Sequence, residues 1–465
     1  MRAARRTGRL SSALLLLTLA TLAAAAAASA EPSYVLGADI SWIPEREASG
    51  VKYAHNGQVK DIFEILKEHK FNYIRLRLFV DPTAKVPEDT PNSDGWSASP
   101  YSAAGYCGLA STVAMAKRVK AAGMGFLLDF HYSDTWADPG KQYKPVSWRD
   151  LNFTQLTEKV RSYTKESLLA FKNAGALPDI VQVGNEVVNG MIHPDGSGNS
   201  ANFAALVNAG INGVKDADPN IKIMMHTINE RNPNGWVSTL KANLNKAEAN
   251  AANKIDVIGL SYYPKWHGNI DSLKRSLTAI ASNHSYKVAV AEYADLHREV
   301  NDVVFALPAN KRFGTFVWEP QEFSGDNSLP LFDWKNGRRE TNSRIALYPI
   351  MAKDYGITDN NATGIIGANK RESASTQLIS VTRGGIVAYN SNVPGVIKVY
   401  SINGRSLGKI KADKPGLYDT SRLSKSGVYM LLIESNDGRL KIKSISLKSN
   451  SLNSFLDGRL EKPNL

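Results

Sequence analysis

Two glutamates stand where short apolar segments end, 106 positions apart in the chain. Glu186 closes the run 179–186 (DIVQVGNE), and Glu292 closes the run 287–292 (KVAVAE). A carboxylate at the mouth of a buried strand is costly to desolvate, so it is expected there only when it does chemistry. Two carboxylates that face each other across a cleft provide what glycoside hydrolysis needs, an acid/base and a nucleophile.

The surroundings of the two glutamates predict which role each one takes. An arginine beside a carboxylate lowers its pKa and keeps it ionised, whereas burial among apolar groups raises the pKa. We expect Arg77 and Tyr263 to lie beside Glu292, which would make Glu292 the nucleophile. We expect Val181 and Val183 to bury Glu186, which would make Glu186 the acid/base.

Short apolar strands alternate with amphipathic helices between residues 31 and 350, and this pattern predicts a (β/α)₈ barrel. An open doubly wound sheet is the alternative, but the first strand is not followed by the glycine-rich phosphate loop usual in that fold. The expected strands are 34–40, 73–79, 125–130, 180–183, 221–226, 257–260, 287–291 and 314–318.

Polar and aromatic residues end nearly every expected strand. The carboxyl ends of barrel strands converge on one face, where the active site lies. Amides, imidazoles and carboxylates there could bond sugar hydroxyls, and indole rings pack against the apolar faces of pyranose rings. The residues expected to bind substrate are Asp39, Arg77, His131, Asp134, Trp136, Asn185, His226, Tyr263 and Trp318.

Two other functions are compatible with a barrel of this kind. Asp129, His131 and His226 could bind zinc or another metal in a metal-dependent hydrolase. The chain lacks the His-x-His and His-Glu-x-x-His motifs, however, and we expect no metal or other cofactor. A non-catalytic polysaccharide-binding barrel is the second alternative, but such a protein would be expected to have lost one of the two glutamates.

Composition divides the chain into a signal, a barrel and a basic tail. Four arginines, an alanine-rich apolar stretch and Ala28-Ser29-Ala30 predict a signal peptide over 1–30 and export. We expect the barrel over 31–355, a linker over 356–376, a small antiparallel β-sandwich over 377–448 and a polar tail over 449–465.

The net charge of +12 belongs mainly to the two ends of the chain. Residues 361–465 hold 16 Lys and Arg against 7 Asp and Glu, so the basic charge lies outside the barrel. Export and the absence of any known nucleic-acid module argue against nucleic acid as a partner. Cys107 is the only cysteine, so no intramolecular disulfide can form. We expect a monomer.

Several segments together resemble arabinogalactan endo-β-1,4-galactanases, glycoside hydrolase family 53. They are 37–41 (GADIS), 129–139 (DFHYSDTWADP), 183–186 (VGNE), 261–264 (SYYP), 291–293 (AEY) and 317–320 (VWEP), in the family's order. The resemblance covers roughly 35–350. It implies a barrel enzyme that cleaves β-1,4-galactan side chains of pectin with retention of configuration.

The resemblance also assigns roles to residues. It makes Glu186 the acid/base and Glu292 the nucleophile, and it gives supporting roles to Arg77, His131, Asn185 and Tyr263. In a retaining enzyme, the two carboxyl groups lie about 5–5.5 Å apart, and we predict that spacing here.

The chain departs from the family in two segments. Some bacterial members carry a long calcium-binding loop after the eighth strand, but the loop 321–330 is short here, which argues against calcium. Segments 396–405 and 426–430 resemble C-terminal sorting domains of secreted bacterial proteins. This resemblance suggests a secretion or cell-surface partner and a secreted or outer-surface location. A carbohydrate-binding module is the alternative.

Overall fold

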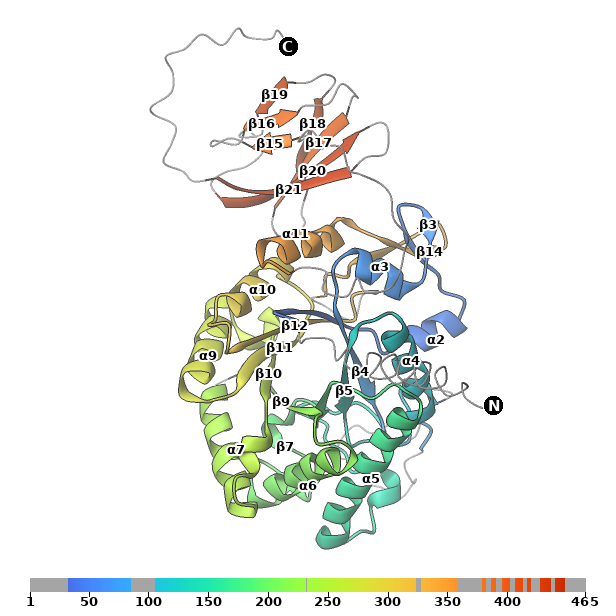
Figure 1. The fold of residues 1–465 in the computed structure, drawn as a ribbon, viewed down its shortest axis with the longest axis vertical. Coiled ribbons are helices and arrows are strands. Elements are labelled where there is room, and N and C mark those ends of the chain that lie inside the picture. Colours follow the sequence, from blue (N-terminus) through green and yellow to red (C-terminus); the bar gives the residue numbers. More distant parts are fainter. Residues whose placement is uncertain are drawn as a thin grey trace, which may run out of the picture.

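The computed structural model describes residues 32–84, 105–230, 232–322 and 328–357, together with strands between 379 and 447. Eight parallel strands close into a barrel, as the sequence predicted (Figure 1). In chain order they are β1 (Val35–Asp39), β4 (Tyr73–Leu78), β5 (Gly125–Phe130), β6 (Ile180–Val183), β9 (Lys222–Ile228), β10 (Val257–Ser261), β11 (Lys287–Tyr293) and β12 (Arg312–Trp318).

The interior of the barrel is packed with side chains from alternate positions of the strands. Successive side chains of a strand point to opposite faces, so every second residue points inward. The lower interior holds an apolar cluster that includes Tyr73, Leu127 and Phe316. Gly37 leaves room for the ring of Phe316, because a Cβ atom there would come within 2.3 Å of that ring.

Helices surround the barrel and cover its apolar outer face (Figure 1). Some of them begin with a polar side-chain cap; α5, for example, starts with a capping box in which Asn152 and Gln155 each bind the other's backbone. The helices are α2 (Ile43–Ala48), α3 (Ile62–Glu68), α4 (Leu109–Ala121), α5 (Phe153–Asn173), α6 (Ala201–Ala217), α7 (Pro233–Ala247), α8 (Pro264–His267), α9 (Ile270–Asn283), α10 (His297–Phe305) and α11 (Leu347–Asp354).

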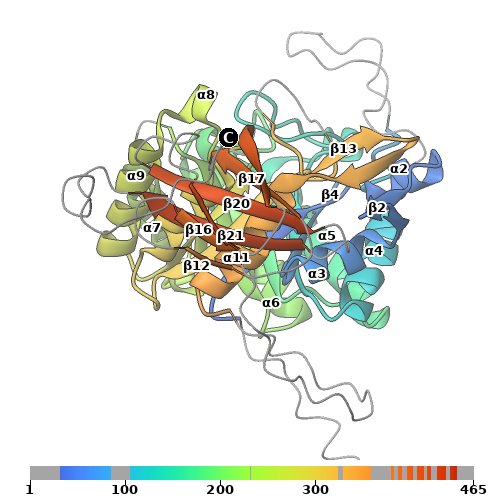
Figure 2. The same ribbon diagram turned by 90° about the horizontal axis from the view of Figure 1, so that it is seen from above.

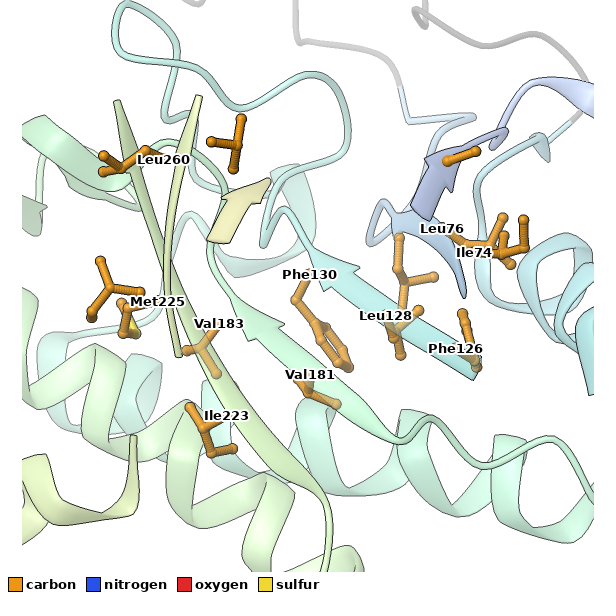
Figure 3. Close-up of a cluster of buried hydrophobic side chains, with 14 of the residues drawn as sticks. Ile74, Leu76, Phe126, Leu128, Phe130, Val181, Val183, Ile223, Met225 and Leu260 are labelled. Atoms are coloured by element: carbon orange, nitrogen blue, oxygen red, sulfur yellow. The ribbon is translucent and has the colours of Figure 1, made fainter. Parts of the chain in front are cut away.

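The outer apolar layer contains two residues that we expected at the catalytic end. Val181 and Val183 point away from the barrel axis and pack in the layer between strands and helices, near Ile223 (Figure 3). The prediction that they bury Glu186 is therefore wrong. Alternation explains the difference, because Gln182 is the residue of this strand that points inward.

Small sheets are built into the loops that follow the barrel strands. The strands β13 (Phe332–Lys335) and β14 (Arg338–Thr341) join β2 (Tyr53–His55) and β3 (Gln58–Val59) in a four-stranded sheet. A short pair, β7 (Gly190–Met191) and β8 (Gly196–Ser197), lies in the loop after β6. Figure 2 shows α8 and β13 rising on the same side of the barrel.

The C-terminal strands form two further sheets, and neighbouring strands are antiparallel, as predicted. One sheet has the order β15-β16-β19 and the other β18-β17-β20-β21. These strands are β15 (Ile379–Val381), β16 (Ile386–Tyr389), β17 (Gly395–Ser401), β18 (Ser406–Ala412), β19 (Gly416–Asp419), β20 (Gly427–Ser435) and β21 (Leu440–Leu447). They lie beyond α11 (Figure 1).

Three predicted segments lie outside the described residues: the signal peptide 1–30, most of the linker 356–376 and the tail 449–465. Within the described part of the chain, no helix is both long enough and apolar enough to span a bilayer.

Candidate active site

Glu292 reaches the site because strand β11 contains a β-bulge. Leu260 of β10 pairs with Val290, whereas the next residue, Ser261, pairs with Glu292, so Ala291 is one extra residue in the strand. Without this bulge, Glu292 would follow Val290 toward the helices. A bulge changes the direction of the side chains that follow it, and here it turns the carboxylate into the barrel mouth.

Two side chains from other strands hold the carboxylate of Glu292. Nη2 of Arg75 lies 2.9 Å from Oε1, and the hydroxyl of Tyr263 donates to Oε2 at 3.0 Å. We predicted an arginine and Tyr263 beside this glutamate, and the Tyr263 contact is confirmed. The arginine is Arg75 and not Arg77, so that part of the prediction is wrong.

Glu186 follows β6 in a strained backbone conformation. Its φ of 47° and ψ of 45° lie in the left-handed region, which non-glycine residues rarely adopt. Gly184, just before it, also has a positive φ. The turned backbone directs the Glu186 N–H toward Nδ1 of His226 at 3.3 Å. Such strain is typical of functional sites whose surroundings fix the geometry.

Burial controls the proton affinity of both glutamates. Burial and, after it, the negative charge of Glu292 raise the pKa of Glu186 to about 8. Burial also raises the pKa of Glu292, to about 7, although Arg75 opposes the shift. We expected the pKa of Glu292 to be depressed, so the direction was wrong, but the order is as predicted. Glu292 is therefore the more acidic of the two carboxyl groups.

Arg75 is the centre of the polar layer below the two glutamates. Its guanidinium donates to Asp39 at 2.9 Å, to Asp129 at 2.8 Å and to Asn185 Oδ1 at 2.8 Å. The side chain is fully buried. Its charge is therefore compensated by neighbouring carboxylates, as a buried cation requires, and one cation fixes groups from four strands.

His131 is oriented by protein groups on both of its nitrogens. Nδ1 accepts from the backbone N–H of Ala137 at 2.9 Å, so Nε2 carries the proton, and Nε2 lies 3.0 Å from Asp129. Among the described residues, no group of three or more His, Cys, Asp or Glu side chains is arranged to hold a metal ion. Part of the loop considered for calcium, 323–327, lies outside these residues.

Arg77 lies among indole rings at the mouth. The centroids of the Trp136 and Trp318 rings are 4.2 and 4.5 Å from its guanidinium carbon, and Trp42 is at 5.1 Å. Nη2 of Arg77 donates to Glu319 at 2.6 Å. Cation–π contacts fix the orientation of these rings. Trp136 and Trp318 are only half-buried, so each residue is partly accessible to solvent.

Three residues expected to bind substrate are instead held by protein groups. Asp39 and His226 are fully buried, and Asp39 bonds Arg75 and Ser41. Both oxygens of Asp134 accept backbone N–H groups, those of Asp81 and Val146. Their contacts with protein groups therefore give Asp39, Asp134 and His226 a supporting role in the site, in place of the direct sugar contact that we expected.

The other predicted residues surround the two glutamates. Asn185 bonds Arg75 through Oδ1 and the Ala137 carbonyl through Nδ2. Sugar binding by Arg77, His131, Trp136, Asn185, Tyr263 and Trp318 stays a prediction. Of the other tryptophans, Trp148 is a core residue, and Trp266 and Trp334 are exposed.

Four functional candidates were missed as site residues: Arg75, Gln182, Ser261 and Glu319. Each lies at or near a strand end, within three residues of a residue that was chosen. Arg75 and Arg77 are two apart on β4, and Gln182 precedes Asn185. Counting inward positions by alternation would have found Arg75 and Gln182.

An eight-stranded parallel barrel with two interacting glutamates at the ends of its fourth and seventh strands is the arrangement of a barrel glycoside hydrolase. The site face, the raised pKa of Glu186 beside Glu292 and the arginine-bound carboxylate all fit that class. A sequence model described as glycosyl hydrolase family 53 matches residues 35–299. The chain belongs to glycoside hydrolase family 53.

Known relatives align with the barrel. The endo-beta-1,4-galactanase of Bacillus subtilis is 36% identical over 262 residues, which are 56% of this chain and 56% of that protein. A probable arabinogalactan endo-beta-1,4-galactanase A of Neosartorya fischeri is 33% identical over 352 residues, 66% of this chain and 92% of the relative. A solved Ignisphaera aggregans GH53 catalytic domain is 30% identical, with a TM-score of 0.58, over 70% of this chain and 98% of that domain.

Proposed function

We propose that the protein is an endo-acting, retaining galactanase that cleaves β-1,4-galactosidic bonds in galactan and in the arabinogalactan side chains of pectin. The observation that carries this proposal is the pair of buried glutamates at the barrel mouth, Glu186 and Glu292, in which the charge of Glu292 raises the pKa of Glu186. Galactan as the substrate rests on the names of the relatives, since barrels of this kind act on many sugars.

The reaction begins with attack on the anomeric carbon. Arg75 and Tyr263 hold the Glu292 carboxylate, so one oxygen can form a covalent bond to the sugar. Glu186, protonated because its pKa is raised, gives its proton to the leaving oxygen. The ionised Glu186 then takes a proton from water, which attacks the sugar and releases Glu292.

A reducing-end assay tests the substrate and the nucleophile together. Wild-type protein and Glu292→Gln are incubated with galactan, arabinogalactan, mannan and xylan. We expect wild type to cleave the two galactans, and Glu292→Gln to bind galactan without cleaving it. Normal turnover by Glu292→Gln would show that the nucleophile is another residue, and cleavage of mannan or xylan alone would refute the substrate.

The stereochemistry of the product tests the mechanism. Proton NMR at early times shows which anomer forms first, and a retaining enzyme gives the β-anomer. First formation of the α-anomer would mean that water attacks directly, as in inverting enzymes, whose carboxyl groups lie about 6.5–9.5 Å apart.

Export and the C-terminal strands form a separate part of the proposal. The signal-like N-terminus and the polymeric substrate support a secreted or surface-attached enzyme, with the C-terminal strands as a sorting domain. Deletion of 361–465 tests this: we expect retained galactanase activity and lost secretion. Normal secretion with weaker pectin binding would instead identify a carbohydrate-binding module.

A further inference from the structure

Ser261 and His226 are buried side chains next to Glu186 to which the proposed reaction assigns no role. Ser261 ends β10 and His226 lies on β9, and both are fully buried. Oγ of Ser261 is 2.9 Å from Nε2 of His226, and the same hydroxyl acts on Glu186, because hydrogen bonding from it lowers the pKa of that carboxyl group. A hydroxyl has one proton and therefore cannot donate to both.

His226 decides which way the hydroxyl points. The imidazole is neutral, because burial and then the nearby Arg75 hold its pKa well below the ordinary value. A neutral ring carries one proton, so one nitrogen donates and the other accepts. If Nε2 has the proton, Ser261 accepts from His226 and is free to donate to Glu186. If Nδ1 has the proton, Ser261 donates to His226.

The groups around Nδ1 favour an accepting nitrogen. The backbone N–H of Glu186 points at it from 3.3 Å, and the amide nitrogen of Gln182 lies at 3.1 Å. Asn185 Oδ1 is also close, at 2.9 Å, but that oxygen already accepts from the Arg75 guanidinium at 2.8 Å. A proton on Nδ1 would leave the Glu186 N–H without this acceptor.

We propose that Ser261 is a positioning residue: the proton on His226 Nε2 forces its hydroxyl to donate to Glu186, in a hydrogen-bonded loop that begins and ends on that glutamate. The order is Glu186 N–H to Nδ1, Nε2–H to Ser261 Oγ, and Ser261 O–H to the Glu186 carboxylate. This donor stabilises the ionised form, which the second step needs as its base. The inference rests on the proposed role of Glu186.

Several charged or titratable groups act on this loop, and the experiment must keep them constant. They are Glu292 on β11, Arg75 on β4, Asp129 and His131 around the end of β5, Asp138 in the following loop, Tyr263 after β10 and His267 on α8. None of them changes when Ser261 is replaced, so a single substitution isolates the hydroxyl.

Nitrogen-15 NMR of the full chain with labelled histidine tests the tautomer directly. His226→Asn assigns the resonances. We expect His226 to carry its proton on Nε2 across neutral pH. A proton on Nδ1 would overturn the proposal, because Ser261 would then donate to His226. This readout needs no substrate, so it is independent of whether the protein cleaves galactan.

Kinetics with an aryl β-galactoside that has a good leaving group tests the effect on Glu186. Bond cleavage then needs little acid help, and breakdown of the glycosyl-enzyme limits kcat.

For Ser261→Ala we expect the acidic limb of the pH profile of kcat to move up by about one pH unit. We expect kcat/KM to be nearly unchanged, and Ser261→Thr to restore the wild-type profile. An unmoved limb, or equal losses in kcat and kcat/KM, would refute the role. No turnover by wild type would instead refute the proposed function.

Discussion

Nη2 of Arg75 lies 2.9 Å from Oε1 of Glu292, although the two residues come from opposite regions of the chain. The same guanidinium also binds Asp39 and Asp129, so Glu292, the proposed nucleophile, is attached to a fixed buried frame. An arginine can hold several acceptors in a rigid planar geometry, which a lysine cannot do. Arg75 therefore sets both the position and the ionisation of Glu292.

Arg75→Lys should weaken catalysis by changing the ionisation of the nucleophile. A lysine keeps the charge but cannot reach all the acceptors, so the pKa of Glu292 rises. We expect kcat to fall roughly hundredfold, and the acidic limb of kcat/KM to move to higher pH. Arg77→Lys is the matched control, since Arg77 does not bond Glu292. Equal shifts in both variants would contradict this account.

The pH profile of the wild type should be bell-shaped. Activity needs Glu292 ionised, so it is lost as pH falls through about 7. Activity also needs Glu186 protonated, so it is lost as pH rises through about 8. The narrow maximum should lie between these values and is measured as kcat/KM on galactan. A flat profile from pH 5 to 10 would exclude this pair as the titrating groups.

Removing the charge of Glu292 should make Glu186 more acidic. Burial is unchanged in Glu292→Gln, but the repulsion between two negative charges disappears. We expect the pKa of Glu186 to fall, as measured by carbon-13 NMR of labelled glutamate. An unchanged or higher value would mean that the two carboxyl groups do not interact.

Trp318→Ala should weaken substrate binding more than it weakens the fold. The ring packs on Arg77, and the residue is only half-buried at the mouth, where we expect a sugar to stack. We expect KM on galactan to rise about tenfold, with little change in kcat. Trp266→Ala, which removes an exposed ring on α8, is the comparison. If both variants have wild-type KM, Trp318 does not contact the substrate.

Asp134→Ala should destabilise the loop that carries Trp136. The carboxylate accepts the N–H groups of Asp81 and Val146, and the variant leaves both without this acceptor. We expect a loss of about 1–3 kcal/mol in the free energy of unfolding, measured with urea. Asp150→Ala, at an exposed position further along the same loop, is the control. Equal stability of the two variants would refute the assignment.

The fold and the two glutamates were predictable because they follow from local patterns. Eight apolar strands alternating with helices indicated the closed barrel, and strand ends marked the site face. Choosing between Arg75 and Arg77 was harder, because both point inward and both are fully buried. The two arginines differ only in their position along the barrel axis, and that position depends on how the neighbouring strands are staggered relative to β4.

The bulge in β11 could not be predicted from the sequence. Strict alternation would place Glu292 on the same outer face as Val288 and Val290. The extra residue is visible only when the partner strands are aligned, since it is defined by the pairing of Leu260 and Ser261. The strained backbone at Glu186 escaped prediction for a similar reason, because long-range contacts maintain it.

The bulge at Ala291 also makes the length of β11 a determinant of activity. If the strand kept all its residues but paired regularly, the carboxylate would turn toward the surrounding helices, even though both glutamates would remain in the chain. Chimeras that take this strand from another barrel should therefore keep the same number of residues between the bulge and the glutamate. Aligning the glutamate alone would keep the residue in the sequence without fixing the face on which its side chain lies.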